Sequence, residues 1–243
     1  MTGWSNALLR VHLACAFLAT GAFWVAAFSR KGGPSHRLTG RRFAQLVYAA
    51  AVTGGVLALV QLVAPSLVRL PDPALSAEAA DAIARRTAQT MWLALYVVVI
   101  LVTPVQHGLA VIAAGRDPRR LRTWPHATLN LLALLSSVFL LPAAVVWRQP
   151  AYALIAPIGF IVGLRNMRYA GRTSASPLDW QREHLTSQLT AGITLHTALF
   201  VFGTSRTLQW AQSGWMLWAP WLLPAVVGLA CIAALRHRTR PWY

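Results

Sequence analysis

Long apolar runs separated by short polar connections make up most of this 243-residue chain. A helix needs about 20 mainly apolar residues to cross the hydrocarbon core of a bilayer. Seven segments come near that length, and they are Ala7–Ser29, Phe43–Val68, Met91–Gly115, His126–Val146, Ala151–Leu164, Leu185–Gly203 and Met216–Leu235. The pattern therefore predicts an all-α integral membrane bundle of about seven transmembrane helices. No shift in composition marks a linker, so we expect residues 1–243 to form a single polytopic membrane domain.

Two regions depart from simple apolar helices. The fifth segment is short and contains Pro157, so it either continues helically through Tyr169 or forms a thin or kinked span. Ahead of the third segment, Asp72 and Pro73 have the residue types of a helix N-cap and a first helical position. We therefore expect an outer helical loop over about residues 70–90 that leads into the third span.

The composition supports a lipid environment. Apolar residues make up 56% of the chain and charged residues 12%, whereas soluble domains carry about 25% charged residues. The mean hydropathy is +0.51. The net charge of +16 would indicate nucleic-acid binding in a soluble protein. Here the basic residues lie in short connections, so we expect anionic lipid headgroups as partners and no nucleic acid.

The distribution of basic residues predicts the orientation of the chain. Sixteen of the 22 Lys and Arg residues fall in connections on one side of the predicted membrane, and six fall on the other. The side richer in Lys and Arg is normally cytoplasmic. With seven spans, the N-terminus is then outside and the C-terminus is cytoplasmic, in a bacterial inner membrane.

Acidic residues are few and lie outside the middle of the predicted spans. They are Asp72, Glu78, Asp81, Asp117, Asp179 and Glu183. Proton-coupled transporters and pumps usually keep carboxylates within the membrane. This distribution argues against that class of protein.

Histidine is the main ionisable residue type inside the predicted spans. His12 and His196 lie in the outer parts of their spans, whereas His107, His126 and His184 lie toward the inner side. Depth-matched histidines on separate helices are typical of membrane cytochromes of the b type. On this interpretation His12 and His196 would hold an outer haem, and His107 with His184 or His126 an inner haem.

The spacing along one helix does not favour this interpretation. His184 and His196 differ by twelve positions, which is about 18 Å of rise but about 120° of rotation. Two ligands on a common face would prefer a spacing of about 11 or 14 residues. The alternative is that the histidines only satisfy hydrogen bonds, in a non-catalytic scaffold or a lipid- or quinone-binding protein.

A second polar group lies at the predicted inner face, and it contains His36, His126 and Glu183, with Asp179 and His184 nearby. Imidazole and carboxylate groups bind zinc or iron, and a metal-dependent membrane enzyme would need three ligands and an open position. Glu183 and His184 are adjacent, so their side chains diverge on a helix and do not easily share one ion. An electrostatic alternative pairs Asp179 and Glu183 with the arginines that follow the first span.

Those arginines suggest a lipid-headgroup site. Arg37, Arg41 and Arg42 follow the first apolar segment closely. A guanidinium group binds phosphate oxygens in a bidentate manner. The alternative is general anchoring at the membrane surface by basic residues.

Two short segments carry a resemblance to a known family. Lys31–Arg41 contains the pattern HR-x-x-G and resembles the signature after the first span of an uncharacterised family of bacterial multi-pass membrane proteins. Trp180–Gly203, with Glu183 and His184, is similar to the other recurrent segment of that family. That family has no assigned activity, so the resemblance implies the membrane bundle and draws attention to His36 and His184. Three function classes stay open: a b-type haem redox protein, a scaffold or lipid- or quinone-binding protein, and a metal-dependent membrane enzyme.

Overall fold

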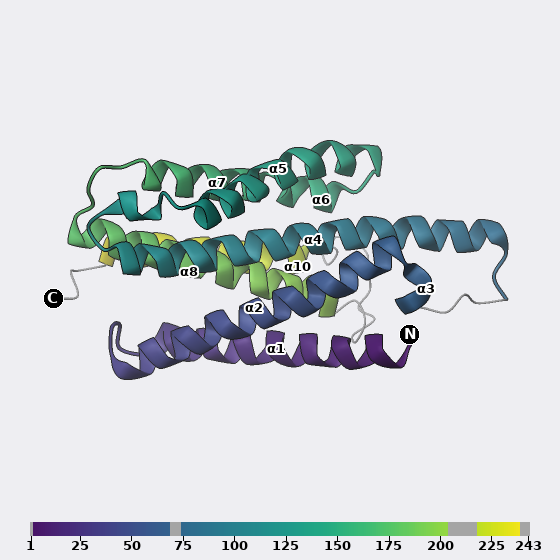
Figure 1. Cartoon of the computed structure of the whole chain (residues 1–243), viewed down its shortest axis with the longest axis horizontal. Coiled ribbons are helices and arrows are strands. Elements are labelled where there is room, and N and C mark those ends of the chain that lie inside the picture. The colour runs from purple at the N-terminus through teal and green to yellow at the C-terminus, as the bar shows by residue number, and fades with distance from the viewer. Residues whose placement is uncertain (1, 69–73, 204–217, 239–243) are drawn as a thin grey trace.

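The structure is a computed structural model that describes residues 2–68, 74–203 and 218–238, and every regular element within these residues is a helix. The helices are α1 Gly3–Phe28, α2 Pro34–Val63, α3 Pro65–Val68, α4 Ala77–Ala114, η1 Pro118–Leu121, α5 Trp124–Val146, α6 Pro150–Ile155, α7 Pro157–Ala170, α8 Pro177–Ala198, η2 Leu199–Gly203 and α10 Ala219–Arg238. The long helices run side by side as an elongated bundle (Figure 1). The prediction of an all-α bundle is therefore confirmed.

Six helical stretches are long and apolar enough to cross a membrane. They are α1, α2, α4, α5, the combined stretch Pro150–Ala170 and the combined stretch Pro177–Gly203. The seventh predicted span corresponds to α10, whose apolar part, Ala219–Leu235, is shorter. Its predicted start at Met216 lies outside the described residues.

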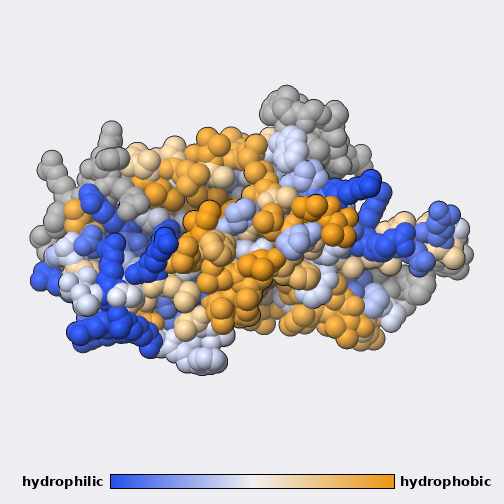
Figure 2. Space-filling view, turned by 90° about the horizontal axis from the view of Figure 1, so that it is seen from above, coloured by the Kyte–Doolittle hydropathy of each residue, from blue (hydrophilic) through white to orange (hydrophobic). Residues whose placement is uncertain are grey.

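Successive spans run in opposite directions, so the connections collect at two ends of the bundle (Figure 1). Loops 29–33, 115–123 and 171–176 lie at one end, which we call the basic end because most of the Lys and Arg residues belong to it or to the adjoining helix turns. Apolar residues dominate the middle of the visible surface, and hydrophilic residues gather at both ends (Figure 2). This distribution matches a bundle whose central band faces lipid.

Helix α4 occupies the centre of the bundle, where it packs against α2, α5, α7 and α8. Half of its most apolar stretch is buried, the largest share among the six candidate spans. Its polar first turns form the expected helical lead-in to the third span, and they project beyond the other helices (Figure 1). The N-cap is Ser76, whose hydroxyl accepts a hydrogen bond from the Ala79 amide, and the expected cap residue Asp72 lies outside the described residues.

The fifth span is broken by Pro157 into α6 and α7, and the helix continues through Tyr169. Pro157 cannot donate a backbone hydrogen bond, so nearby backbone groups need other partners. The buried Tyr96 hydroxyl of α4 supplies them, because it lies 2.9 Å from the Ile155 carbonyl oxygen and accepts from the Gly159 amide at 2.9 Å. The prediction that the helix continues through Tyr169 is confirmed, and a side chain from a neighbouring helix stabilises the break at Pro157.

Candidate functional site

A chain of buried ionisable side chains links three helices near the basic end. His107 of α4 is fully buried, and its Nδ1 lies 2.8 Å from His126 Nε2 of α5. On the other side of the ring, His107 Nε2 lies 3.1 Å from Glu183 Oε1 of α8. With an ionised Glu183, the carboxylate only accepts, so His107 Nε2 donates to it and His107 Nδ1 accepts from His126 Nε2–H. The hydrogen bonds then run in one direction, from His126 through His107 to Glu183.

Arg165 of α7 adds a fourth helix to this group. Its Nε lies 3.4 Å from Glu183 Oε1. Its terminal nitrogen donates to the Ser187 hydroxyl at 3.0 Å and to the Asn166 side-chain oxygen at 3.3 Å. A carboxylate removed from water needs a nearby opposite charge, and the guanidinium of Arg165 provides it for Glu183.

Two buried asparagines hold α5 and α7 together beside this group. Asn166 Nδ2 donates to Asn130 Oδ1 at 2.9 Å, and Asn130 Nδ2 donates to the His126 carbonyl oxygen at 2.7 Å. The helices approach closely here because α7 carries glycines at the contact. A Cβ at Gly163 would lie 2.7 Å from the Asn130 carbonyl oxygen, which is too close for any other residue without a backbone shift. The close contact lets the short asparagine side chains meet.

His126 also lines a pocket of about 300 Å³ at the basic end. The other lining residues are Ala110, Ala113 and Ala114 of α4, Arg120 and Leu121 of η1, and Thr123. The pocket therefore has a wall of small apolar side chains, one guanidinium group and one hydroxyl group. Because His126 belongs to both features, the pocket adjoins the start of the hydrogen-bonded chain.

The turn that carries Arg120 is fixed by an acidic cap. Asp117 caps η1 by accepting a hydrogen bond from the Arg119 amide, and it also accepts from Arg119 Nε at 2.9 Å. The side-chain hydrogen bond from Arg119 holds the pKa of the Asp117 carboxyl below its usual range. Asp117 therefore stays ionised near neutral pH and keeps its cap on the turn that lines the pocket.

Several buried side-chain polar atoms have no hydrogen-bond partner within the described part of the chain. Among them are the Tyr169 hydroxyl, Gln106 Oε1 and both amide atoms of Gln181. The Tyr169 ring stands perpendicular to the His107 ring, with 5.8 Å between ring centres. Buried polar groups are nearly always satisfied in folded proteins, so such atoms indicate places for water or a ligand.

The structure separates the two histidines predicted to hold an outer haem. His12 Nδ1 donates to the Ala50 carbonyl oxygen of α2 at 2.9 Å. His196 Nδ1 donates to its own helix at Gly192, and its Nε2 accepts from Trp24 Nε1 at 3.0 Å. Trp24 follows His12 by twelve positions on α1, which is about 18 Å along the helix. His12 and His196 therefore lie at different depths, and both His196 nitrogens are engaged.

Of the two pairs predicted for an inner haem, His107 and His126 are hydrogen-bonded directly to each other, whereas His107 and His184 have separate partners. His107 is held between His126 and Glu183, as described above. His184 instead donates from Nδ1 to the Gly108 carbonyl oxygen at 2.9 Å and faces His36 of α2, with 6.4 Å between ring centres. The structure thus brings His184 together with His36, a residue predicted for a metal site, and pairs His107 with His126.

The predicted metal set of His36, His126 and Glu183 does not converge. His126 and Glu183 bind opposite sides of the His107 ring, and His36 lies beside His184. Among the described residues no group of three or more His, Cys, Asp or Glu side chains is placed to hold a metal ion. The expected pairing of Asp179 with the loop arginines is also absent from the described ion pairs, because Asp179 forms a capping box with Ser176.

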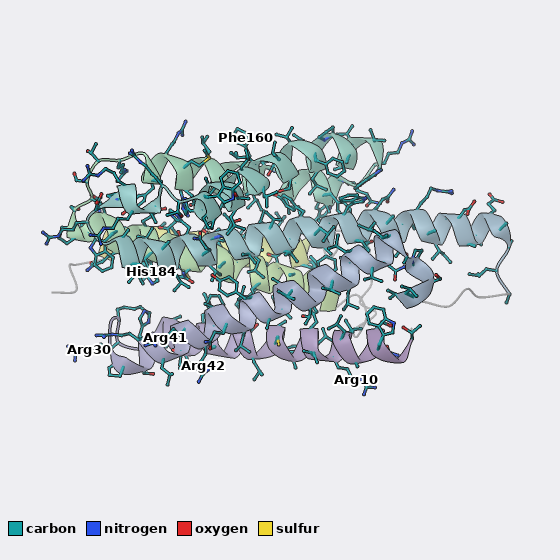
Figure 3. All side chains as sticks on the ribbon, viewed as in Figure 1. Arg10, Arg30, Arg41, Arg42, Phe160 and His184 are labelled. Atoms are coloured by element: carbon teal, nitrogen blue, oxygen red, sulfur yellow. The ribbon has the colours of Figure 1, made fainter. Side chains whose placement is uncertain are left out.

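The predicted lipid-headgroup residues lie on the exposed surface of the first turns of α2. Arg37, Arg41 and Arg42 are all exposed. Arg37 Nε donates to the Gly32 carbonyl oxygen at 2.6 Å, and Arg42 donates to Gln45 at 3.0 Å. Arg41 and Arg42 lie at the same end of the bundle as His184, whereas Arg10 lies at the other end (Figure 3).

Sequence reasoning missed Arg165, Asn130 and Asn166. The sequence did contain a signal for Asn130. It follows His126 by four positions, so the two side chains share a helix face. Glu183 was also placed just ahead of the sixth span, which was predicted to start at Leu185. The helix begins at Pro177, so Glu183 lies inside it.

No protein-family model, curated protein or solved structure matches this chain. The resemblance to the uncharacterised membrane family stays a prediction.

Proposed function

We propose that the chain is a seven-span protein of a bacterial inner membrane, with its N-terminus outside and its C-terminus in the cytoplasm, that binds a quinone beside His126. The six apolar helical stretches and the additional apolar helix support the span count. The collection of basic connections at one end supports a cytoplasmic position for that end.

One observation carries the ligand proposal: His126 both lines a pocket and begins a buried hydrogen-bonded chain that ends at Glu183. A quinone carbonyl oxygen accepts hydrogen bonds, and the corresponding quinol exchanges protons when it is formed or consumed. A site for such a ligand therefore needs a hydrogen-bond donor and a route for protons. Chains of His and Glu residues within membranes are typical proton relays.

The pocket lining suits the head of this ligand class. Ala110, Ala113 and Ala114 offer a small apolar wall for a flat ring, and Arg120 and Thr123 supply hydrogen-bond donors. A volume of about 300 Å³ is at the lower end for ligand sites, which fits one ring with its apolar tail outside the pocket. A lipid phosphate would need several converging cations, whereas Arg120 is the single basic side chain among the lining residues of this pocket.

The test is a titration of the purified protein in lipid nanodiscs with a short-tailed ubiquinone, followed by calorimetry. We expect saturable binding to the natural chain and at least a tenfold loss of affinity in the His126→Gln variant, about 1.4 kcal/mol. The matched control is His12→Gln, which changes a histidine on α1 far from the pocket and should leave the affinity unchanged.

Two outcomes would overturn the ligand proposal. One is the absence of saturable binding to the natural chain. The other is equal affinity in the His126→Gln and His12→Gln variants, because His126 would then have no part in the site. Gel filtration of each variant in detergent shows whether the fold has been kept.

A further inference from the structure

Polar side chains of α4, α5, α7 and α8 form a ring of contacts around His126, and two members of the ring set the direction of its hydrogen bonds. The guanidinium of Arg165 only donates hydrogen bonds, and the ionised carboxylate of Glu183 only accepts them. The two groups lie side by side, with 3.4 Å between Arg165 Nε and Glu183 Oε1. The side chains that connect them the long way round, through His126, must follow the direction that these two groups set.

One arm of the ring runs from Arg165 to His126 through two asparagines. A terminal nitrogen of Arg165 donates to Asn166 Oδ1 at 3.3 Å, and Asn166 Nδ2 donates to Asn130 Oδ1 at 2.9 Å. Asn130 Nδ2 donates to the His126 carbonyl oxygen at 2.7 Å, and it also lies 3.4 Å from Nδ1 and 3.3 Å from Nε2 of the His126 ring. An amide nitrogen does not accept hydrogen bonds, so Asn130 presents a donor to this ring.

The other arm determines which nitrogen of His126 carries the proton. Glu183 accepts from His107 Nε2 at 3.1 Å, so the neutral His107 ring has its lone pair on Nδ1. His107 Nδ1 therefore accepts from His126 Nε2 at 2.8 Å. A neutral His126 then carries its proton on Nε2 and its lone pair on Nδ1. The two arms agree, because the donor of Asn130 also needs a lone pair on the His126 ring.

This tautomer decides what His126 offers to the pocket that it lines. Nε2 is engaged with His107, so a ligand in the pocket can form a hydrogen bond with the ring only at Nδ1, which accepts. The contact from Asn130 Nδ2 to Nδ1, at 3.4 Å, is longer than the usual range of about 2.7–3.2 Å, so a ligand hydroxyl can replace it. A quinol hydroxyl donates to such an acceptor, whereas a quinone carbonyl oxygen would place its lone pairs against it.

We propose that the pocket beside His126 binds the reduced quinol in preference to the quinone, because His126 Nδ1 accepts a hydrogen bond from a quinol hydroxyl. This inference rests on the proposed quinone-binding function and adds the form of the ligand. Arg165 and Glu183 are positioning residues, since neither lines the pocket and both act through the hydrogen bonds to His126. A quinone binds more weakly, because it needs a proton on Nδ1 and hence a reversed chain that begins at a protonated Glu183.

The experiment compares the two forms of one short-tailed ubiquinone. The full chain in lipid nanodiscs is titrated by calorimetry under argon with the quinol and, separately, with the quinone. We expect the quinol to bind roughly tenfold more tightly, because it forms a hydrogen bond that the quinone cannot form without reversing the chain. The quinol dimethyl ether keeps the ring but has no hydroxyl donor, so it should lose this advantage.

The outcomes of the titration separate this inference from the proposed function. Equal or tighter binding of the quinone would overturn the inference and leave the quinone site standing. Saturable binding of neither form would overturn both.

Two variants of Glu183 test its positioning role. Glu183→Gln keeps an acceptor oxygen toward His107 and should keep the preference for the quinol. Glu183→Leu removes that acceptor, so the proton of His107 is no longer directed and the preference should disappear. The same preference in both variants would show that Glu183 does not set the tautomer of His126.

Nitrogen-15 NMR of the histidine-labelled chain tests the tautomer without any ligand. The His126 signals, assigned by their loss in His126→Gln, should show a protonated Nε2 and an unprotonated Nδ1. This measurement uses the natural chain, so it decides the matter even where a Glu183 variant does not fold. A protonated Nδ1 would overturn the inference.

Discussion

His107 Nε2 lies 3.1 Å from Glu183 Oε1, although the two residues are 76 positions apart in the chain. Their contact fixes α4 against α8 and places a carboxylate inside the bundle. Glu183 has 13% of its side chain exposed and also faces Arg165, at 3.4 Å. An ionisable group buried within a membrane bundle usually marks a functional site. It also needs partners close by that compensate its charge.

Removal of the Glu183 charge should destabilise the bundle. The Glu183→Gln variant removes the carboxylate that faces both His107 and Arg165, and loss of one member of a buried ion pair costs about 3 kcal/mol. Thermal unfolding in detergent should therefore shift to a lower temperature. Glu78→Gln is the control, because Glu78 is exposed in the first turn of α4. Additive effects of Glu183→Gln and Arg165→Gln in the double variant would show that the two charges do not interact.

The contact between α5 and α7 should not tolerate a methyl group at Gly163. A Cβ there would lie 2.7 Å from the Asn130 carbonyl oxygen, so the helices must move apart. Gly163→Ala should lower stability by about 1–3 kcal/mol, the range for overpacking. Gly21→Ala is the matched control, since nothing lies within 4 Å of a Cβ at Gly21. Equal thermal unfolding of the two variants would contradict the close packing.

The fold could be predicted largely from the sequence because length and apolarity determine what crosses a membrane. The six candidate spans of the structure all contain or overlap predicted segments, and Pro157 marked the break in the fifth span. Helix ends were less predictable. The sixth span begins at Pro177 instead of Leu185, because Ser176 and Asp179 form a capping box ahead of the apolar run.

The candidate site could be predicted only in part, because depth in the membrane does not say which helices are neighbours. His12 and His196 were grouped by their predicted depth, yet His196 contacts Trp24 and His12 contacts Ala50. The link from His107 to Glu183 joins helices far apart in the chain, which no local pattern encodes. The sequence indicated which residues make polar contacts better than it indicated their partners. His36, His107, His126 and His184 all have defined polar contacts.

The Tyr96 hydroxyl should be the main stabiliser of the break at Pro157. It contacts the Ile155 carbonyl oxygen and the Gly159 amide, so Tyr96→Phe leaves buried backbone groups without this partner. The expected loss is about 1–3 kcal/mol in the free energy of unfolding. Tyr48→Phe is a suitable control, because the described part of the chain shows no hydrogen bond from the Tyr48 hydroxyl. An equal thermal transition in both variants would show that the Tyr96 hydroxyl bonds contribute no net stability.

The orientation of the chain can be tested with reporters fused at opposite ends of the bundle. A reporter after Tyr243 should give a cytoplasmic signal, because the last helix runs toward the basic end (Figure 1). A reporter inserted after Leu75, just ahead of α4, should give a periplasmic signal, because the first turn of α4 lies at the end opposite the basic end. Each fusion is the control for the other, because the proposed topology places the two fusion points on opposite sides of the membrane. A periplasmic signal from the Tyr243 fusion would reverse the proposed orientation of the last span, and the same signal from both fusions would rule out an odd number of crossings between them.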